Sequence, residues 1–358
     1  MNINENSISE KDIFLASTAA EAAFEAVTPY LENEYSADVK QIIEAKITKA
    51  IEEKEKSNKK LRQLQKTELE ILTELDRVCR KHKLRYYIVG GTLIGAARTG
   101  GFIPWDDDID VSMPREDFDK LLTLKDEFSD EFFLQTHKTE KDCYFFYAKL
   151  RKNGTYFGED KFEHTGIHKG IFMDIFPLDY ISDKGIIQKL CFKSFSLINA
   201  FICSKKKTSE FLYKNMSLPF IVTFRIIQCI LPLPLLYGLR SLIAKLTKAL
   251  SNKRLVASLA GFHGYPKEIA PFELWAEGTD IDFEGKTVRA PKEYKKLLNH
   301  MFGDYMQLPP VEERVNHTVA DENIIFEGVT AEDYKPKFKR KRSHRYYGVD
   351  YDIIPFEK

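Results

Sequence analysis

The sequence has few cysteines, no net charge and no signal-like start. Its five cysteines are widely spaced, and no pair has the CxxC spacing typical of zinc sites. Lysine plus arginine and aspartate plus glutamate both total 54, which argues against a chain-wide attraction to nucleic acid. The segment 1–12 is polar and acidic, unlike a secretory signal. These absences favour a cytoplasmic protein without a disulfide framework or a nucleic-acid partner.

A basic and apolar segment breaks the overall neutrality. Residues 184–254 contain thirteen basic residues and one acidic residue, Glu210. The longest apolar run, 218–239, is interrupted by Arg225 and two prolines, so it is a poor membrane-spanning helix. Two interpretations stay open: a segment that lies on the anionic inner face of the plasma membrane, and an ordinary helical subdomain with a basic surface.

The full sequence is 43% hydrophobic and 30% charged, which is typical of a folded protein. Its patterns predict an α+β architecture. Strands are expected at 86–89, 109–113, 132–136, 144–150 and 171–176, with a strand and turn at 281–288. Helical spacing is expected over about 10–84, with a charged stretch at 52–60, and over 115–128. The predicted organisation is a helical N-terminal extension (1–60), a catalytic core (61–183), the basic apolar helical insertion (184–254), the C-terminal part of the catalytic region (255–334) and a basic tail (335–358).

The chemistry is concentrated around one glycine turn and three aspartates. Strand alternation places Asp108 and Asp110 on one face, and Asp174 lies in another apolar strand. Carboxylates without nearby histidine or cysteine ligands favour Mg²⁺ or Mn²⁺, so these three residues are the predicted catalytic and metal-binding set. Gly90 and Gly91, followed by Thr92 at the start of a short helix, let the backbone approach a phosphate closely.

These motifs carry a resemblance to a known family. The segments 90–98 and 101–110, followed by 168–179, are similar to the LicD family of phosphotransferases, to which fukutin and fukutin-related protein are related. The similarity covers about 62–182 and resumes more loosely in 270–318, at 283–285 and 305–310. It implies a nucleotidyltransferase fold and the transfer of phosphocholine from CDP-choline, or of a phospho-alditol from a related CDP donor. The implied acceptor is a sugar hydroxyl of a surface glycan such as teichoic acid, lipopolysaccharide or capsule.

Further residues are assigned roles with open alternatives. Arg98 is the predicted phosphate clamp, against a surface ion pair with the acidic loop. Lys149 is expected to point to the diphosphate, and Trp105 to stack on a base or on choline, against an ordinary packing role. Asp106 and Asp107 are additional ligands or loop acids, and His164 and His168 are taken as structural. The rival functions are nucleotidyl transfer to a small molecule and a non-catalytic membrane-associated adaptor.

Overall fold

The computed structural model describes the backbone of residues 37–159, 162, 165–205, 226, 230–259, 261, 264–310, 314, 324–335, 338–340 and 353–355. The chain divides into two compact units, residues 1–66 and 67–358. In the first unit the described part is helical, because helix α2 runs unbroken over Ala37–His82. The charged stretch at 52–60 is therefore helix, and the part of the predicted extension before residue 37 lies outside the described residues.

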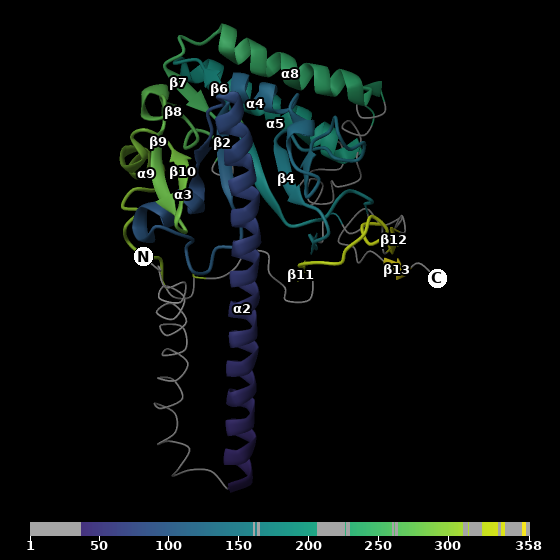
Figure 1. The fold of residues 1–358 in the computed structure, drawn as a ribbon. Coiled ribbons are helices and arrows are strands. Elements are labelled where there is room, and N and C mark those ends of the chain that lie inside the picture. Colours follow the sequence, from purple (N-terminus) through teal and green to yellow (C-terminus); the bar gives the residue numbers. More distant parts are fainter. Residues whose placement is uncertain are drawn as a thin grey trace. The chain divides into compact units, whose positions relative to one another are not determined.

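The second unit is built on a mixed sheet whose main path runs in the order β1-β2-β6-β4-β3. Its strands β2, β4 and β6 are labelled in Figure 1. The strands are β1 (Tyr87–Ile88), β2 (Asp110–Pro114), β3 (Phe132–Gln135), β4 (Ala148–Lys152) and β6 (Phe172–Ile181). Strands β2 and β6 are parallel, whereas the other neighbours on this path are antiparallel. Strand β7 (Leu255–Ala257) extends the sheet from β6 and pairs with β8 (Ala270–Pro271). The predicted α+β class is confirmed, while the nucleotidyltransferase fold stays a prediction.

Hydrophobic alternation explains the central strands. Val111 and Met113 of β2 and Met173 and Ile175 of β6 are fully buried. Each strand also carries an aspartate at its start: Asp110 is half-buried where β2 begins, and Asp174 is half-buried two residues into β6. The sheet therefore holds its carboxylates at one end of its two parallel strands, above an apolar interior.

Helices and smaller ribbons complete the second unit. Helix α3 (Gly90–Thr99) and helix α9 (Tyr294–Phe302) lie with the hairpin of β9 (Thr279–Phe283) and β10 (Lys286–Ala290) beside β1 and β2 (Figure 1). The other elements are α4 (Arg115–Leu121), α5 (Gly185–Lys205), α8 (Leu233–Ala249), the 3-10 turns Lys125–Glu127 and Phe272–Leu274, and the short ribbons of β5 (Tyr156–Phe157) with β11 (Ile324–Ile325) and of β12 (Phe338–Arg340) with β13 (Ile353–Pro355).

Two sequence expectations need correction. The strand expected at 144–150 begins only at Ala148, because the preceding aromatic residues pack in a separate cluster, where the rings of Phe145 and Phe162 meet edge-on at 5.4 Å. The helix expected over 115–128 ends at Leu121 and is followed by a 3-10 turn. Helix α8 falls inside the basic insertion, which confirms helix there; most of the apolar run 218–239 lies outside the described residues.

Candidate functional site

The acidic loop and two strand aspartates form one electronegative centre. Asp106, Asp107 and Asp108 each place a carboxylate oxygen within 4.8 Å of the others. Asp110 follows in the same loop as it enters β2, and it is the direct register partner of Asp174 in the parallel strand β6. The structure thus places Asp106 and Asp107 in the same cluster as the predicted ligands. From the sequence alone, these two residues could be either additional ligands or acids of the loop.

Burial and mutual repulsion raise the pKa values of Asp106 and Asp110. The pKa of Asp110 lies well above its usual range because of burial and because Asp108 and Asp174 stand nearby. Burial, with the charges of Asp108 and Asp107, raises the pKa of Asp106 to about 8. Such crowding favours either bound protons or a bound cation, since ionised carboxylates repel one another where water is scarce.

Glu68 of helix α2 is a further acid at this centre that sequence reasoning missed. Its side chain is 2% exposed, and its Oε2 has no hydrogen-bond partner among the described residues. Burial, and then the charges of Asp108 and Asp107, raise its pKa well above the usual range. The one sequence feature that could have revealed Glu68 is its position as a charged residue on the apolar side of a helix. Ile71 and Leu72, on the same side in the following turn, are fully buried.

The glycine turn starts helix α3 directly beside these acids. Gly90 has φ +58°, and a Cβ there would lie 3.6 Å from Oδ2 of Asp110. At Gly91 a Cβ would lie only 2.3 Å from Oδ2 of Asp106, so a side chain is excluded unless the carboxylate moves. Thr92 accepts a hydrogen bond from the backbone N–H of Asp110 at 3.0 Å, which fixes the helix to β2.

The N-terminus of α3 has the features of an anion site. Val89, the residue before its first turn, provides no side-chain cap, and the first turn contains no acid. The N–H groups at the start of this helix and its dipole therefore face the same region as the carboxylates. This juxtaposition is suited to a phosphate and a cation held together.

Lys149 is buried against Asp174, and its expected contact with the diphosphate stays a prediction. Its ammonium Nζ lies 3.0 Å from Oδ1 of Asp174 and 3.9 Å from Oε2 of Glu159, and only 1% of the residue is exposed. The ring centre of Phe172 is 3.2 Å away. Burial lowers the pKa of Lys149, while Asp174 opposes that shift, so the pair neutralises one carboxylate at the edge of the centre.

Arg98 lies at the far end of α3 and holds a distant loop. Its Nε donates to the carbonyl of Tyr305 at 2.5 Å and its Nη2 to that of Gln307 at 2.9 Å. Its phosphate role stays a prediction. Glu284 acts similarly on the acidic loop, since its carboxylate accepts from the N–H of Phe102 at 3.1 Å and the rings of Phe102 and Phe283 pack at 4.9 Å. The segments 283–285 and 305–310, where the resemblance to the LicD family is looser, therefore contact α3 and the loop that follows it.

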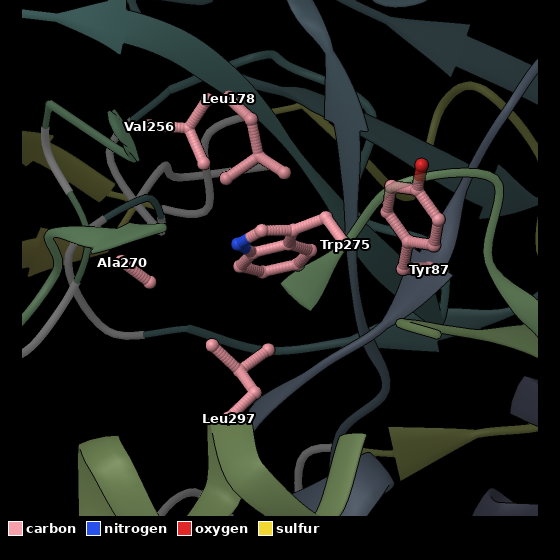
Figure 2. Packing of buried hydrophobic residues seen from close by; sticks show 6 residues of the cluster. All are labelled: Tyr87, Leu178, Val256, Ala270, Trp275 and Leu297. Atoms are coloured by element: carbon pink, nitrogen blue, oxygen red, sulfur yellow. The ribbon is translucent and has the colours of Figure 1, made fainter. Parts of the chain in front are cut away.

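A largely apolar pocket adjoins the acidic centre. It has a volume of about 690 Å³ including its mouth, and Gly90 and Asp110 form part of its wall. Figure 2 shows Trp275 between Tyr87 on one side and Val256 and Ala270 on the other, with Leu297 rising from α9. The remaining lining is Val89, Leu93, Ser112, Phe176, Leu178, Ser258, Gly261, Glu268, Leu298, Met301 and Phe302.

The polar groups of this pocket are few and all acidic or neutral. Glu268 and Asp110 line it, and the described lining contains no basic side chain. Two buried atoms, Nε1 of Trp275 and Oγ of Ser258, have no hydrogen-bond partner among the described residues. Trp105, the aromatic residue expected to stack on the donor, is half-buried and lies 5.5 Å from the guanidinium carbon of Arg314. The stacking role of Trp105 stays a prediction, and Trp275 lines the pocket together with Asp110.

Fold and site together define an α+β domain in which clustered carboxylates face the N-terminus of a glycine-started helix. Residues 83–201 match the family model described as LicD/FKTN/FKRP, nucleotidyltransferase domain. The chain therefore carries a LicD family domain, and the resemblance read from its motifs is confirmed.

Relatives extend this likeness beyond the domain. The chain is 29% identical over 294 residues to the lipopolysaccharide cholinephosphotransferase LicD of Haemophilus influenzae, which covers 74% of this chain and 98% of that protein. Shorter matches reach an uncharacterized protein of Rickettsia typhi, 43% identical over 18% of each chain, and one of Rickettsia prowazekii, 44% identical over 16% of this chain and 19% of the other.

Proposed function

We propose that this protein is a LicD-type transferase that moves phosphocholine from CDP-choline to a sugar hydroxyl of a cell-surface glycan. The observation that carries the proposal is the convergence of the α3 N-terminus with Asp106, Asp108, Asp110 and Asp174. A diphosphate needs both anion-binding N–H groups and countercharge, and this centre offers the two side by side. The Haemophilus relative, named for transfer of cholinephosphate in lipopolysaccharide, supports a glycan acceptor of that kind.

The carboxylates fit a divalent cation of the magnesium or manganese type. The fit rests on the carboxylate oxygens of Asp106, Asp107 and Asp108, which lie within 4.8 Å of one another, and on the raised pKa of Asp110 beside them. A cation relieves the repulsion that otherwise favours protonation. Asp108, Asp110 and Asp174 would hold the ion, with Asp106 and Asp107 as additional ligands. When bound, such an ion stabilises the negative charge that develops on a departing phosphate.

Backbone and side-chain groups of the protein would bind the donor and accept the proton of the acceptor hydroxyl. The backbone N–H groups at Gly90 and Gly91 bind the donor diphosphate. The acceptor oxygen forms a bond to the phosphorus of the phosphocholine group, the bond from that phosphorus to CMP breaks, and CMP leaves with the electron pair. One of the site carboxylates takes the proton of the acceptor hydroxyl. Lys149 keeps Asp174 in place through their 3.0 Å contact and opposes the rise that burial causes in the pKa of this carboxyl.

The pocket beside Asp110 suits the choline head group. A quaternary ammonium prefers aromatic faces and nearby negative charge, and the pocket offers Trp275, Phe176 and Phe302 together with Glu268. The trimethylammonium group has no proton to donate, so apolar walls leave nothing on it unsatisfied. Replacing choline by ribitol or glycerol in the donor would put hydroxyl groups against these walls at a cost.

The deciding experiment measures products. Purified protein is mixed with CDP-choline, CDP-ribitol, CDP-glycerol or CTP and a pool of sugar acceptors, with and without Mg²⁺ or Mn²⁺, beside Asp110→Asn. We expect cation-dependent CMP release with CDP-choline and loss of at least about a hundredfold in rate in the variant. Pyrophosphate released from CTP, with no CMP from any CDP donor, would identify nucleotidyl transfer instead. Absence of both reactions and of cation binding would favour the non-catalytic adaptor.

A further inference from the structure

An exposed apolar face covers two neighbouring helices far from the acidic centre in sequence. Of the twelve large apolar side chains that are exposed in the described part of the chain, nine lie between Ile186 and Leu250. Six of them define what we call the α5–α8 face: Ile186, Leu190, Leu197, Leu235, Leu242 and Leu246. Contiguous exposed apolar surface of this kind marks an interaction site more often than chance exposure does.

Helical periodicity places these residues on one side of each helix. In α5 the steps from Ile186 to Leu190 and on to Leu197 are four and seven residues, and in α8 Leu235, Leu242 and Leu246 follow at seven and four. Exposure is high at the start of α5, where Ile186 is 78% exposed and Leu190 59%.

The opposite sides of both helices are buried in the same two apolar clusters. Phe192 and Phe195 of α5 pack with Ile243 of α8, and Phe201 and Ile202 of α5 pack with Leu236 of α8. Because the two helices share these clusters, their exposed sides both turn away from the protein. In Figure 1 α8 runs along the same end of the sheet as α5.

Lysines accompany this face. Lys189 and Lys193 of α5 and Lys245 of α8 are exposed, and none has a carboxylate within ion-pair distance among the described residues. Lys248 differs, since its Nζ is paired with Glu116 at 2.6 Å. The three exposed lysines therefore place positive charge beside the apolar side chains of the α5–α8 face.

We propose that the α5–α8 face binds the surface of an anionic lipid bilayer, with its leucines and isoleucines in the interfacial layer and its lysines at the lipid phosphates. Helix α5 is long and apolar enough to cross a membrane by length and composition. Its phenylalanines, however, are committed to the protein clusters, which favours a helix lying on the surface over a spanning one. A second copy of this chain fits poorly, because a two-fold contact would bring the same lysines together.

Binding at the α5–α8 face determines the location of the protein and is separate from the reaction at the acidic centre. A bilayer contact would bring the acidic centre to an acceptor that is itself anchored in a membrane, such as a glycolipid. It does not depend on the identity of the donor, so binding and transfer can be tested separately.

The test is co-sedimentation with vesicles of phosphatidylcholine, with and without phosphatidylglycerol, at low and at high salt. The variants are Lys189→Glu/Lys193→Glu, which alters the charge, and Leu190→Glu/Leu242→Glu, which alters the apolar face. The matched controls are Lys295→Glu/Lys296→Glu on α9 and Leu308→Glu, which change equally exposed residues elsewhere. Circular dichroism and thermal unfolding check that each variant is folded, and light scattering gives the oligomeric state.

We expect wild-type protein and both controls to bind the anionic vesicles at low salt. Each lysine near the surface contributes about 1 kcal/mol, so losing two should weaken binding at least twentyfold. The leucine variant should lose binding at least tenfold, and CMP release with a soluble acceptor should stay unchanged in both. The proposal would be overturned if wild-type protein did not bind anionic vesicles. It would also be overturned if the lysine and leucine variants of the α5–α8 face bound them as well as the control variants do. A dimer that dissociates in the leucine variant would assign the face to a second copy.

Discussion

At the scale of single residues, the centre depends on glycines where side chains would collide with carboxylates. Gly91 has ordinary helical backbone angles in α3, so any residue could adopt its conformation. A side chain is excluded there because it would collide with the carboxylate of Asp106. Gly238 in α8 offers the opposite case, because a Cβ there meets nothing within 4 Å. The two glycines therefore separate the effect of a clash at the site from the general effect of glycine in a helix.

Gly91→Ala is expected to impair transfer while leaving the protein folded. The new Cβ would lie 2.3 Å from Oδ2 of Asp106, so this carboxylate must move from its place in the acidic centre. A displacement of about 1 Å at a reacting centre can cost about a hundredfold in rate. Gly238→Ala should leave the rate unchanged and stabilise the protein by about 0.5–1 kcal/mol. Steady-state CMP release and urea unfolding measure the two effects, and equal rates for both variants would refute the role of Gly91.

Lys149→Met is expected to destabilise the protein strongly, because it leaves Asp174 buried without its partner at 3.0 Å. Breaking one side of a buried pair costs about 3–5 kcal/mol. Adding Asp174→Asn should recover part of the loss, since the unpaired charge is then removed. Lys152 on the same strand is the control: its partners Glu131 and Glu70 are exposed, so Lys152→Met should cost at most about 1 kcal/mol. Similar losses for the two lysine variants in urea unfolding would contradict the assignment.

At the scale of elements, the stretch that leads into β6 is fixed by one neutral histidine. Nδ1 of His168 accepts from the N–H of Gly170 at 3.0 Å, and Nε2 lies 2.9 Å from Oδ1 of Asn153. The first bond requires Nδ1 to be unprotonated, so the proton sits on Nε2. Burial lowers the pKa of His168 to about 3, so this histidine is neutral at neutral pH. His164 lies outside the described residues.

His168→Asn should change how stability depends on pH. In the unfolded chain the histidine binds a proton below pH about 6.5, whereas the folded protein resists protonation down to about 3. The contribution of His168 to stability is therefore fully present above pH about 6.5 and is lost as the pH falls, by up to about 1.4 kcal/mol per pH unit. Asparagine keeps an acceptor near Gly170 but does not titrate. Urea unfolding from pH 7 to 4 should thus show a shallower loss in the variant, and parallel profiles would refute this.

Local patterns predicted most elements, and long-range contacts explain the failures. Strand β2 and the β9–β10 hairpin have clear alternation or turn signals, and both form where expected. The aromatic residues at 144–147 have strand-like composition, yet they pack in two clusters: Tyr144, Phe145 and Tyr147 with Phe162, and Phe146 against Phe195. No local sequence pattern predicts these contacts. Glu68 joins the acidic centre only because α2 packs next to the loop of Asp106, so its role follows from tertiary structure. Arg98 likewise finds its partners, two backbone carbonyls, only in the folded chain.

At the scale of the whole molecule, the acidic centre links the stability of the second unit to its charge. Its carboxylates come from three parts of the chain: Glu68 on α2, the loop 106–108 with Asp110, and Asp174 on β6. Mutual repulsion among these carboxylates opposes folding unless bound protons or a cation reduce it. The same repulsion contributes to the raised pKa values of Asp110 and Glu68. A cation bound there would therefore draw these three segments together.

Mg²⁺ or Mn²⁺ is accordingly expected to raise the unfolding temperature. A ligand that binds only the folded state stabilises it by about 2.7 kcal/mol at one hundred times its dissociation constant. The shift should be much smaller in Asp108→Asn and in Asp110→Asn, whose sites have one ligand charge fewer, and these apo variants should be as stable as the wild type or more so because repulsion is reduced. Asp280→Asn is a suitable control, because that aspartate pairs with Arg80 and Arg289 on the surface. Thermal unfolding with EDTA and with each metal distinguishes the cases: an equal metal shift in all variants would mean that the ion binds elsewhere.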